Sequence, residues 1–360
     1  MNDKIIINHF GPLKQVELEL NDIMVFIGPQ ASGKSTIAKL IHFLKFLTSK
    51  QGASSYDNKK AFSLFNQFFG EHDLSNNPNM EIEYLFQPDS KITINHHSIH
   101  YNPFPKLDYK TILIPAGRAV YSLISDSLFS LTSEAVSIDP LILNFGQHIE
   151  LSRKRLKNQL TENPALEIWL QEILKGHFKY VNGENRIYFE QDKYITLDRA
   201  SSGQQEVLPL LLILMDIVHS SQIHFVTIEE PEAHLYPYSQ YKLIQLISYI
   251  HNVHPHKHHF IITTHSPYIL TAFNNLQFAH QVANRSEDAK LSVTKVIPQT
   301  TWLNSEKLSA YYVSEGGIAS IVDESTGLIA DNEIDDASEE IAGQFDELLT
   351  IYRKFKHGNG

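Results

Sequence analysis

The residues most able to carry out chemistry form the run GPQASGKS at 28–35, which has the GxxxxGK[ST] spacing of a phosphate-binding loop. Glycines let the backbone turn its N–H groups inward onto phosphate oxygens, and the helix that follows adds the positive end of its dipole. Lys34 would reach the β- and γ-phosphates of a nucleotide, and the hydroxyl of Ser35 would bind Mg²⁺. The pattern predicts nucleotide contacts from Gly28, Pro29, Gln30, Ala31, Ser32, Gly33, Lys34, Ser35 and Thr36.

Two adjacent acids end a second apolar run, IHFVTIEE at 223–230. In an enzyme with a phosphate loop, the first acid, Glu229, holds Mg²⁺ through water, and the second, Glu230, polarises the attacking water as a general base. Two carboxylates at the end of a buried strand repel each other and are poorly solvated, which is costly without a cation. The pair therefore predicts a magnesium site made by Ser35 and Glu229, with Glu230 as a catalytic residue.

A third apolar run that ends in polar residues is IITTHSP at 261–267. Because the carboxyl ends of parallel strands share one edge of a sheet, His265 would lie beside the acids and within reach of a γ-phosphate. Read by itself, a histidine at a strand end more commonly caps a loop. The catalytic interpretation of His265 therefore depends on the other motifs.

The run SSGQQ at 201–205 lies between a predicted hairpin and an apolar helix. Small residues at the start of a helix expose N–H groups to an anion, as the phosphate loop does. The same residues are also ordinary helix-capping sequence. The position of the run, shortly before the acid pair, is what gives it interest.

A mainly parallel sheet would bring these motifs together, and the hydrophobic pattern predicts one. IMVFIG at 23–28 and HFIITT at 259–264 are continuous apolar runs, as expected of strands buried on both faces. Strands alternate with helical segments in the second half, which indicates an α/β fold with helices flanking the sheet. Alternating runs at 5–10 and 15–20 predict an antiparallel β layer in the N-terminal third.

These patterns divide the chain into three parts. Residues 1–47 and 185–300 are predicted to form a nucleotide-binding core. Residues 48–184 would form a β-hairpin pair and a helical insertion, and residues 301–360 an acidic C-terminal helical segment.

The negative charge is concentrated near the C-terminus. The 360 residues include 41 acids and 30 bases, for a net charge of −11, and eleven of the acids lie between Leu308 and Tyr352, where there is no Lys or Arg. The rest of the chain is neutral, so bulk charge says little about nucleic acid. The apolar spacing from Asp335 to Phe355 predicts a helix with one apolar face, which would dock on its own domain or on a partner with a basic surface.

One dense basic segment and two clusters of histidines carry weaker signals. The basic segment at 153–157 could contact a phosphate backbone, although a solvated helix face is the commoner meaning of such a run. Histidines crowd the segments 96–100 and 251–259. A structural zinc ion would want tetrahedral Cys or His ligands with a supporting shell, and without cysteine we expect solvated loops in both places.

The composition also excludes several classes of protein. The absence of cysteine excludes thiolate chemistry and a disulfide scaffold and fits a reducing compartment. The N-terminus does not have the pattern of a signal peptide. The longest apolar run, at 207–218, is interrupted by Pro209 and Asp216 and is too short to cross a bilayer. We therefore expect a soluble cytoplasmic protein with no membrane partner.

The order of GPQASGKS, SSGQQ, VTIEEPEAHLYP and TTHSP resembles the ABC-type ATPases, specifically the non-transporter branch of RecF, SMC and OLD-like proteins. The opening INHFGPLKQVELEL is similar to the same branch. The resemblance covers residues 4–47 and 185–275 well and residues 48–184 only in outline. It implies an ABC-type P-loop NTPase fold, with ATP and Mg²⁺ as cofactors.

The resemblance also implies roles for individual residues. Lys34 and Ser35 match the Walker A positions, Glu229 the Walker B metal position, Glu230 the catalytic glutamate and His265 the switch histidine. The D-loop at the dimer interface corresponds to residues 231–235. The signature motif, which contacts the ATP held by the opposite subunit, corresponds to Ser201, Ser202, Gly203 and Gln204.

Two features depart from the family pattern or leave a choice open. The signature is SSGQQ rather than LSGGQ, and Gln30 stands where relatives usually carry Asn. The Q-loop glutamine is not obvious: Gln87 is one candidate, and ILIPAGR with Arg118 resembles a motif seen at this place in the OLD-like branch. We favour Arg118 as the nucleotide-site residue.

By this likeness, two chains would sandwich two ATP molecules head to tail, as a homodimer or a higher even oligomer. The leading hypothesis is an ATP-hydrolysing switch that controls a separately encoded effector, a nuclease or toxin, in bacterial defence against phage. The first alternative is a RecF-like clamp that grips duplex DNA when ATP is bound. The second is a nucleotide-dependent scaffold that does not hydrolyse ATP.

Overall fold

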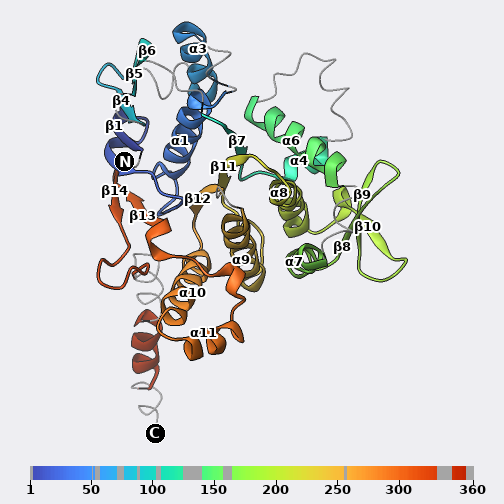
Figure 1. Ribbon diagram of the computed structural model, residues 1–360. Helices are drawn as coiled ribbons and strands as arrows, with labels where there is room; N and C mark the ends of the chain where they lie inside the picture. The colour runs from blue at the N-terminus through green and yellow to red at the C-terminus, as the bar shows by residue number, and fades with distance from the viewer. Residues whose placement is uncertain are drawn as a thin grey trace.

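The computed structural model shows three β-sheets with helices packed on them (Figure 1). It describes residues 3–50, 52, 57–70, 77–86, 90–102, 107–124, 140–156, 164–254, 258–330 and 343–353. The largest sheet has six strands in the order β14-β13-β3-β12-β11-β7. The other two sheets are antiparallel and have five and three strands.

Five strands of the six-stranded sheet run parallel, so their carboxyl ends share one edge. They are β3 (Ile23–Ile27), β7 (Tyr109–Ile114), β11 (Ile223–Glu229), β12 (His259–Thr264) and β13 (Leu308–Ser314), and the antiparallel β14 (Gly317–Ser320) completes the sheet. Every residue of β3 is buried, as its continuous apolar sequence predicts. The motifs that follow β3, β11 and β12 therefore meet at this edge.

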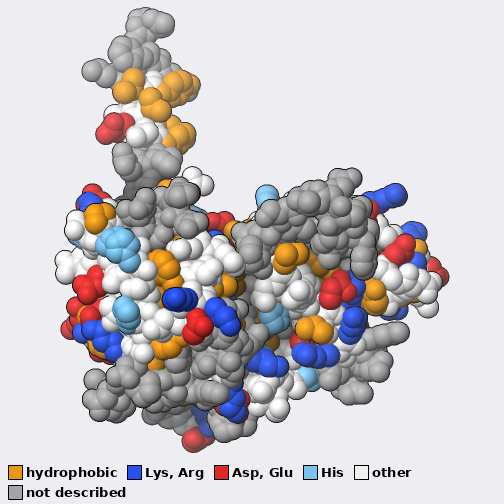
Figure 2. Space-filling view, turned by 90° about the horizontal axis from the view of Figure 1, so that it is seen from above, with side chains coloured by type: hydrophobic (Ala, Val, Ile, Leu, Met, Phe, Trp, Pro, Cys, Tyr) orange, Lys and Arg blue, Asp and Glu red, His pale blue; other side chains and the backbone are white. Residues whose placement is uncertain are grey.

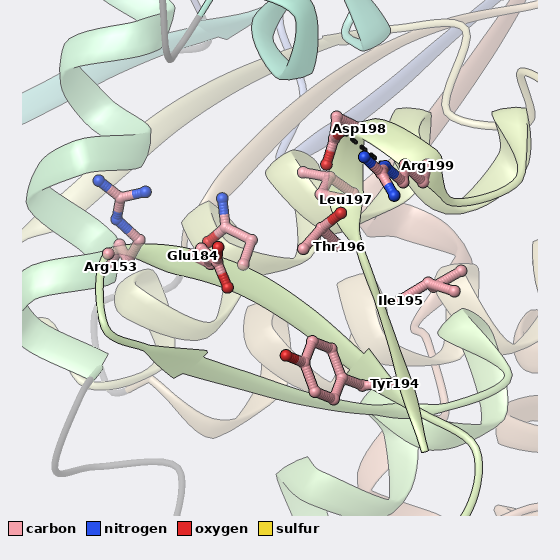
Figure 3. A pocket seen from close by; sticks show the side chains of 10 residues that line it. Arg153, Glu184, Tyr194, Ile195, Thr196, Leu197, Asp198 and Arg199 are labelled. Carbon is pink, nitrogen blue, oxygen red and sulfur yellow. Dashed lines mark ion pairs between the residues drawn. The ribbon is translucent and has the colours of Figure 1, made fainter.

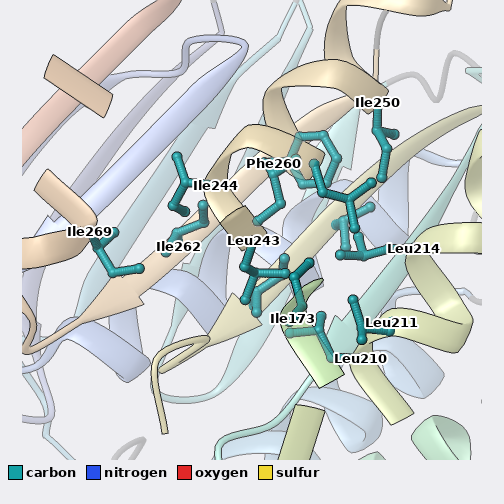
Figure 4. Close-up of a cluster of buried hydrophobic side chains, with 14 of the residues drawn as sticks. Ile173, Leu210, Leu211, Leu214, Leu243, Ile244, Ile250, Phe260, Ile262 and Ile269 are labelled. Carbon is teal, nitrogen blue, oxygen red and sulfur yellow. The ribbon is translucent and has the colours of Figure 1, made fainter. Parts of the chain in front are cut away.

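Long helices cover both faces of this sheet. They are α1 (Lys34–Thr48), α8 (Ser202–Val218), α9 (Pro237–Val253) and α10 (Pro267–Ala283), and the shorter α11 (Glu287–Thr294) packs on α10. Alternate residues of β3 enter two separate hydrophobic clusters, as the period of a strand dictates. Val25 packs with α8, α9 and α10, the cluster shown in Figure 4, whereas Phe26 packs with α1. Burial of each large aliphatic side chain contributes about 1.5–3 kcal/mol to stability. The packing on both faces therefore holds the strands of this sheet in place.

The five-stranded antiparallel sheet shares its hydrophobic cluster with α1 and has the order β2-β1-β4-β5-β6. Its strands are β1 (Lys4–Phe10), β2 (Leu13–Glu19), β4 (Glu81–Leu85), β5 (Lys91–Asn95) and β6 (Ser98–Asn102), and helix α3 (Asn58–Phe69) lies beside β6. Residues of β1 alternate between buried and less buried, because one face covers the cluster and the other faces away. The predicted antiparallel layer is therefore present.

The helical insertion surrounds α8 and carries the small three-stranded sheet. Its elements are α4 (Ala119–Ile124), α6 (Pro140–Leu156), α7 (Pro164–Leu174), β8 (His177–Val181), β9 (Glu184–Tyr188) and β10 (Tyr194–Thr196). In the described part of the chain, short 3₁₀ helices occupy 197–199, 299–301 and 305–307. The α/β fold class with a mainly parallel sheet, an antiparallel layer and a helical insertion is confirmed.

The sheets of the structure cross the predicted domain boundaries at several places. β9 pairs with β8, and β10 with β9, although β9 and β10 lie almost wholly in the range 185–300 predicted as core. β7 belongs to the six-stranded sheet although it was placed in the insertion at 48–184, and β13 and β14 belong to it although they were placed in the C-terminal segment at 301–360. β13 lies between β14 and β3, and Ala310 and Val313 are fully buried there. Pairing across such a distance in sequence depends on the whole sheet, which local patterns do not reveal.

Beyond Ala330, the C-terminal acidic segment is described at 343–353, which is helical and mostly exposed. The helix projects from the body of the molecule, with apolar side chains on its surface (Figures 1 and 2). The neighbouring residues 331–342, with most of the predicted acidic run, lie outside the described residues. Among the helices that the structure describes, none combines the length and the apolar character needed to span a bilayer.

The histidines near 251–259 are more buried than the predicted solvated loop. His251 and His258 are fully buried, and His258 accepts a hydrogen bond at Nδ1 from the backbone N–H of His224 (3.2 Å). His259 stacks on Phe225, with ring centroids 4.2 Å apart. They lie at the end of α9 and the starts of β11 and β12, so the loop prediction is wrong for them. Among the described residues, no group of three His, Cys, Asp or Glu side chains suits a metal ion.

These buried histidines predict that acid destabilises the fold. Burial lowers the pKa of His258 to about 3 and those of His224 and His259 to about 4. An unfolded histidine titrates near 6.5, so the unfolded state binds more protons below that pH. The free energy of unfolding should therefore fall as pH drops from about 6.5 toward 4, by roughly 1 kcal/mol per pH unit for each such histidine.

Urea unfolding at pH 7.5 and 5.5 would measure this loss. His258→Asn keeps an acceptor for the N–H of His224 and should reduce the loss, whereas His97→Asn, at an exposed position, should not. An equal loss in wild type and His258→Asn would remove this histidine from the explanation.

Candidate active site

The phosphate loop connects β3 to α1 and is held by close backbone contacts at two glycines. Gly28 has φ 144° and Gly33 has φ 107°, a region that residues with a side chain rarely adopt. A Cβ atom at Gly28 would lie 2.3 Å from the carbonyl oxygen of Val313, and one at Gly33 would lie 2.6 Å from Cδ2 of Leu13. The loop is therefore fixed between β13 and the turn from β1 to β2, and both positions require glycine.

Lys34 lies folded over this loop. Its Nζ donates hydrogen bonds to the carbonyl oxygens of Gly28 (2.8 Å) and Pro29 (2.6 Å). Burial lowers the pKa of Lys34, and the carboxylates of Glu230 and Glu232 oppose that effect. The ammonium is thus placed where the phosphates of a nucleotide in the loop would lie.

A pocket of about 270 Å³ opens over the loop. Glu230 and His265 lie on one side of it, and Pro12 joins the lining from the turn between β1 and β2. The loop residues around the pocket are Gln30, Ala31, Ser32, Gly33, Lys34, Ser35 and Thr36. The structure therefore brings together most of the predicted phosphate-loop residues, while Gly28 and Pro29 hold Lys34 from behind.

Glu229 is the last residue of β11, and its side chain is buried behind the pocket. Its Oε1 lies 3.6 Å from Nζ of Lys39, and among the described residues this buried oxygen has no hydrogen-bond donor. Mg²⁺ typically binds one or two protein oxygens together with substrate phosphates and water. The carboxylate of Glu229 and the hydroxyl of Ser35 at the pocket fit such an ion.

Glu230 follows in an unusual backbone conformation, with φ 44°. Its N–H donates to the carbonyl oxygen of Thr263 on the adjacent strand (2.9 Å), which ties this turn to β12. The carboxylate oxygen Oε1 lies 3.6 Å from Nε2 of His265. The predicted general base and the predicted histidine therefore lie next to each other at the pocket.

His265 is held mainly in the neutral form. Burial and the nearby ammonium of Lys34 lower the pKa of His265, while the carboxylate of Glu230 and a hydrogen bond to the carbonyl of Gly28 act in the opposite direction. A neutral imidazole presents one donor and one acceptor nitrogen. Its single N–H can donate to a phosphate oxygen only in exchange for the carbonyl of Gly28, while the ring remains close to Glu230.

Glu232 also belongs to this site, although no role for its side chain was predicted. Its Oε1 accepts hydrogen bonds from the hydroxyl of Thr264 and from the backbone N–H of His265, both at 2.7 Å. Burial raises the pKa of Glu232. The signal was present in the sequence as a third acid in EEPEAH, but the strand it would meet was not evident from spacing.

The signature segment (residues 201–205) starts helix α8 and does not line the phosphate-loop pocket of its own chain. Ser201 caps the helix and forms a capping box with Gln204, and both Ser201 and Ser202 are exposed. A Cβ at Gly203 would lie 2.6 Å from the carbonyl oxygen of His234, so this glycine allows close packing against the loop after the acids. The four predicted signature contacts do not line the phosphate-loop pocket.

Arg118 is not a nucleotide contact in this structure, which corrects the prediction. Its side chain is fully buried and is absent from the lining of the pocket. The guanidinium donates hydrogen bonds to four backbone carbonyl oxygens, those of Pro115, Glu206, Glu229 and Glu230. The other candidate for this role, Gln87, lies outside the described residues.

A larger pocket of about 540 Å³ lies apart from these residues, at the three-stranded sheet (Figure 3). Arg153 from α6 lines it together with Tyr194 and Arg199. Arg153 forms an ion pair with Glu150, and Arg199 forms one with Asp198. Arg155, on the same helix as Arg153, forms an ion pair with Asp216, so much of the basic segment is neutralised locally.

Comparison with known proteins gives one family and several similar folds. A family model described as AAA ATPase domain matches residues 1–163 and 121–270. No curated protein matches the chain.

Three of the similar solved structures each cover 89% of this chain and are themselves 98% covered. The SMC head domain from Thermotoga maritima is 14% identical with a TM-score of 0.42. An SMC head bound to the C-winged helix domain of ScpA is 13% identical with a TM-score of 0.47. The recombination mediator protein RecF of the RecFOR pathway is 13% identical with a TM-score of 0.39.

Proposed function

This chain belongs to the AAA ATPase domain family and is an ATPase, and from that premise we propose that it is a molecular switch. In this proposal two copies bind head to tail around two ATP molecules, and hydrolysis lets them separate. A separate effector protein responds to whether the two copies are bound together or apart. ATP hydrolysis is confirmed by the family match, whereas the dimer, any higher even oligomer and the effector stay predictions.

The observation that carries the proposal is the separation of the two nucleotide-binding motifs within one chain. The phosphate-loop pocket contains Lys34, Glu230 and His265 but no residue of the signature segment. Ser201 and Ser202 are exposed at the N-terminus of α8, where the N–H groups and the helix dipole favour an anion. A second chain could supply its signature segment to the open side of the pocket and so complete the site.

The residues of the site then divide the work of hydrolysis. Lys34 neutralises the phosphates, and Glu230 accepts a proton from the water that attacks the γ-phosphate. Neutral His265, which lies 3.6 Å from the carboxylate of Glu230, positions the γ-phosphate for the water that Glu230 activates. Ser35 and Glu229 would hold Mg²⁺, which stabilises the charge that develops on the phosphate oxygens.

We propose a protein effector, rather than duplex DNA, as the partner of the switch. The helix at 343–353 exposes Phe345, Leu348 and Ile351, with exposed fractions of 64%, 64% and 52%. Exposed apolar side chains gathered on one element favour a protein contact. Arg153 and Arg155, the strongest candidates for contacts with DNA phosphates, already form ion pairs with Glu150 and Asp216. A nuclease or toxin effector in defence against phage is the form of this proposal that the family resemblance suggests.

Mixing two inactive variants tests the composite site. Lys34→Ala disables the phosphate loop, and Ser202→Asp places a negative charge where the other chain's phosphates would lie. Aspartate is tolerated in the first turn of a helix, so α8 should remain folded. Each variant alone should lose hydrolysis, and an equal mixture should recover about a quarter of wild-type activity, because half of the dimers have one intact site of two.

The control is Ser286→Asp, at the N-cap of α11 and far from the motifs, which should remain active. Steady-state ATP hydrolysis, assayed after the variants are mixed and equilibrated, reports the recovery. No recovery, or full activity of Ser202→Asp alone, would contradict the head-to-tail arrangement.

A further inference from the structure

We propose that Arg118 and Glu206 form a buried positioning pair that links the start of α8 to the backbone of the catalytic acids. The inference rests on the proposed function, because it assigns a route by which docking of a second chain at the start of α8 affects the acids of the same chain. Neither residue contacts the phosphate-loop pocket. They act through Glu229 and Glu230.

Arg118 forms hydrogen bonds with the backbone at the end of β11. Its Nη1 donates to the carbonyl oxygen of Glu229 (2.7 Å), and its Nη2 donates to the carbonyl oxygen of Glu230 (3.0 Å). The same Nη1 donates to the carbonyl of Pro115 at the end of β7, which fixes the guanidinium relative to the sheet (3.0 Å). One planar group therefore determines the position of two successive peptide units that carry the acids.

The hydrogen bonds from Arg118 bind the backbone at a residue whose conformation is strained. Glu230 has φ 44°, in the left-handed region that costs a residue with a side chain of order 1–2 kcal/mol. Such a conformation persists only where surrounding contacts determine it. The contacts here are the hydrogen bond from Glu230 N–H to Thr263 and two that its carbonyl accepts, from the N–H of Ala233 (3.0 Å) and from Arg118. Arg118 supplies the side-chain contact among them. The direction of the Glu230 carboxylate into the pocket therefore depends on Arg118.

Glu206 connects Arg118 to α8. Its carboxylate accepts hydrogen bonds from the backbone N–H groups of Arg118 (3.0 Å) and Ala119 (3.1 Å), and its carbonyl oxygen accepts one from Nε of Arg118 (2.9 Å). Oε2 of Glu206 also lies 3.5 Å from Nε. Glu206 is buried one turn into α8, directly after the signature segment.

The pair therefore makes one connected, buried unit from the signature segment to the acids. Burial strengthens its electrostatic contacts, and removing one partner leaves the other charge unpaired. A small movement at the N-terminus of α8, caused by docking of a second chain against it, would shift Glu206 and hence the carbonyls that Arg118 holds. Hydrolysis would then start only after the second chain has closed.

Three variants test the pair by separating catalysis from nucleotide binding. Glu206→Gln keeps the size of the side chain but removes its charge and one acceptor, so kcat for ATP should fall about 10-fold or more while KM changes less than about 2-fold. Arg118→Lys replaces the fork with a point charge that cannot reach both carbonyls, and it should lower kcat further. The double variant should lose no more than Arg118→Lys alone, because the two residues act as a unit.

A purely structural role would give a different pattern. A structural defect would lower the urea midpoint and the fraction of active protein together. It would not lower kcat while leaving KM unchanged, and the losses of the two single variants would add up in the double variant. If Glu206→Gln does not fold, Glu206→Asp keeps the charge but shortens the reach to the N–H groups, and the same loss in kcat alone is expected. Glu287→Gln, on exposed α11, is the matched control and should leave both constants unchanged.

The result also has to be distinguished from failure of the proposed function. In the Glu230→Gln background, ATP-dependent dimerisation is measured with and without Glu206→Gln. If Glu230→Gln does not dimerise with ATP, the switch itself is contradicted. If it dimerises but Glu206→Gln alone has the wild-type kcat, the positioning pair is contradicted and the switch stands.

Discussion

Replacing Glu230 with glutamine is expected to lower kcat for ATP hydrolysis by about 10²–10⁴-fold, the range attributable to a general base. Glutamine has nearly the same shape but cannot accept a proton from water. Its side chain would still face His265, whose Nε2 lies 3.6 Å from the present carboxylate. The backbone contacts of Glu230 to Thr263 and Arg118 do not involve the carboxylate, so the turn should keep its conformation.

ATP binding should survive this change, because the phosphates are held by the loop and Lys34. A chain that binds ATP but does not hydrolyse it should accumulate in the closed state. Gel filtration with ATP should therefore show a stable dimer for Glu230→Gln, whereas the wild type should show a monomer once its ATP is consumed.

Glu287→Gln provides the control for the same chemical change at an exposed position on α11. It should hydrolyse ATP at the wild-type rate. If Glu230→Gln also hydrolyses ATP at that rate, Glu230 is not the base, and the neighbouring Glu232 would be the next carboxylate to test. If it is inactive but remains monomeric with ATP, the catalytic role stands and the sandwich does not.

The phosphate loop and the strand-end acids could be predicted because their signals are local. A fixed spacing of glycines, lysine and serine after a buried strand determines the loop whatever the rest of the chain does. The meeting of Lys34, Glu230 and His265 in one pocket then follows from the common edge of parallel strands. The contacts that make Gly28 and Gly33 obligatory come from Val313 and Leu13, and no spacing rule could have named those partners.

Arg118 shows where this reasoning stops. The resemblance of ILIPAGR to a motif of the OLD-like branch implied a nucleotide contact for Arg118, yet its side chain is buried and donates to backbone carbonyls more than 80 residues away in sequence. Glu206, its partner, lies in an apolar helix and carried no motif of its own. Contacts of this kind depend on how helices and strands pack, so only the three-dimensional structure reveals them.

Replacing Lys34 with alanine is expected to reduce kcat/KM for ATP by at least about 10²-fold, through loss of a preorganised positive charge at the phosphates. Glu230→Gln should keep ATP binding and lose hydrolysis, whereas Lys34→Ala should weaken ATP binding as well. The two hydrogen bonds from Nζ to the carbonyls of Gly28 and Pro29 would also be lost, so the loop would no longer be held by its own lysine. Nucleotide binding and hydrolysis should therefore fall together.

Stability should change little or increase, since burial of the Lys34 ammonium, which lowers its pKa, already disfavours the charged form. Equilibrium binding of a fluorescent ATP analogue, the hydrolysis rate and the urea midpoint would be measured on the same preparation, with Lys290→Ala on exposed α11 as the matched control. Loss of binding with an unchanged midpoint places the defect in the loop. Wild-type hydrolysis by Lys34→Ala would contradict this site, because no other lysine lines the pocket.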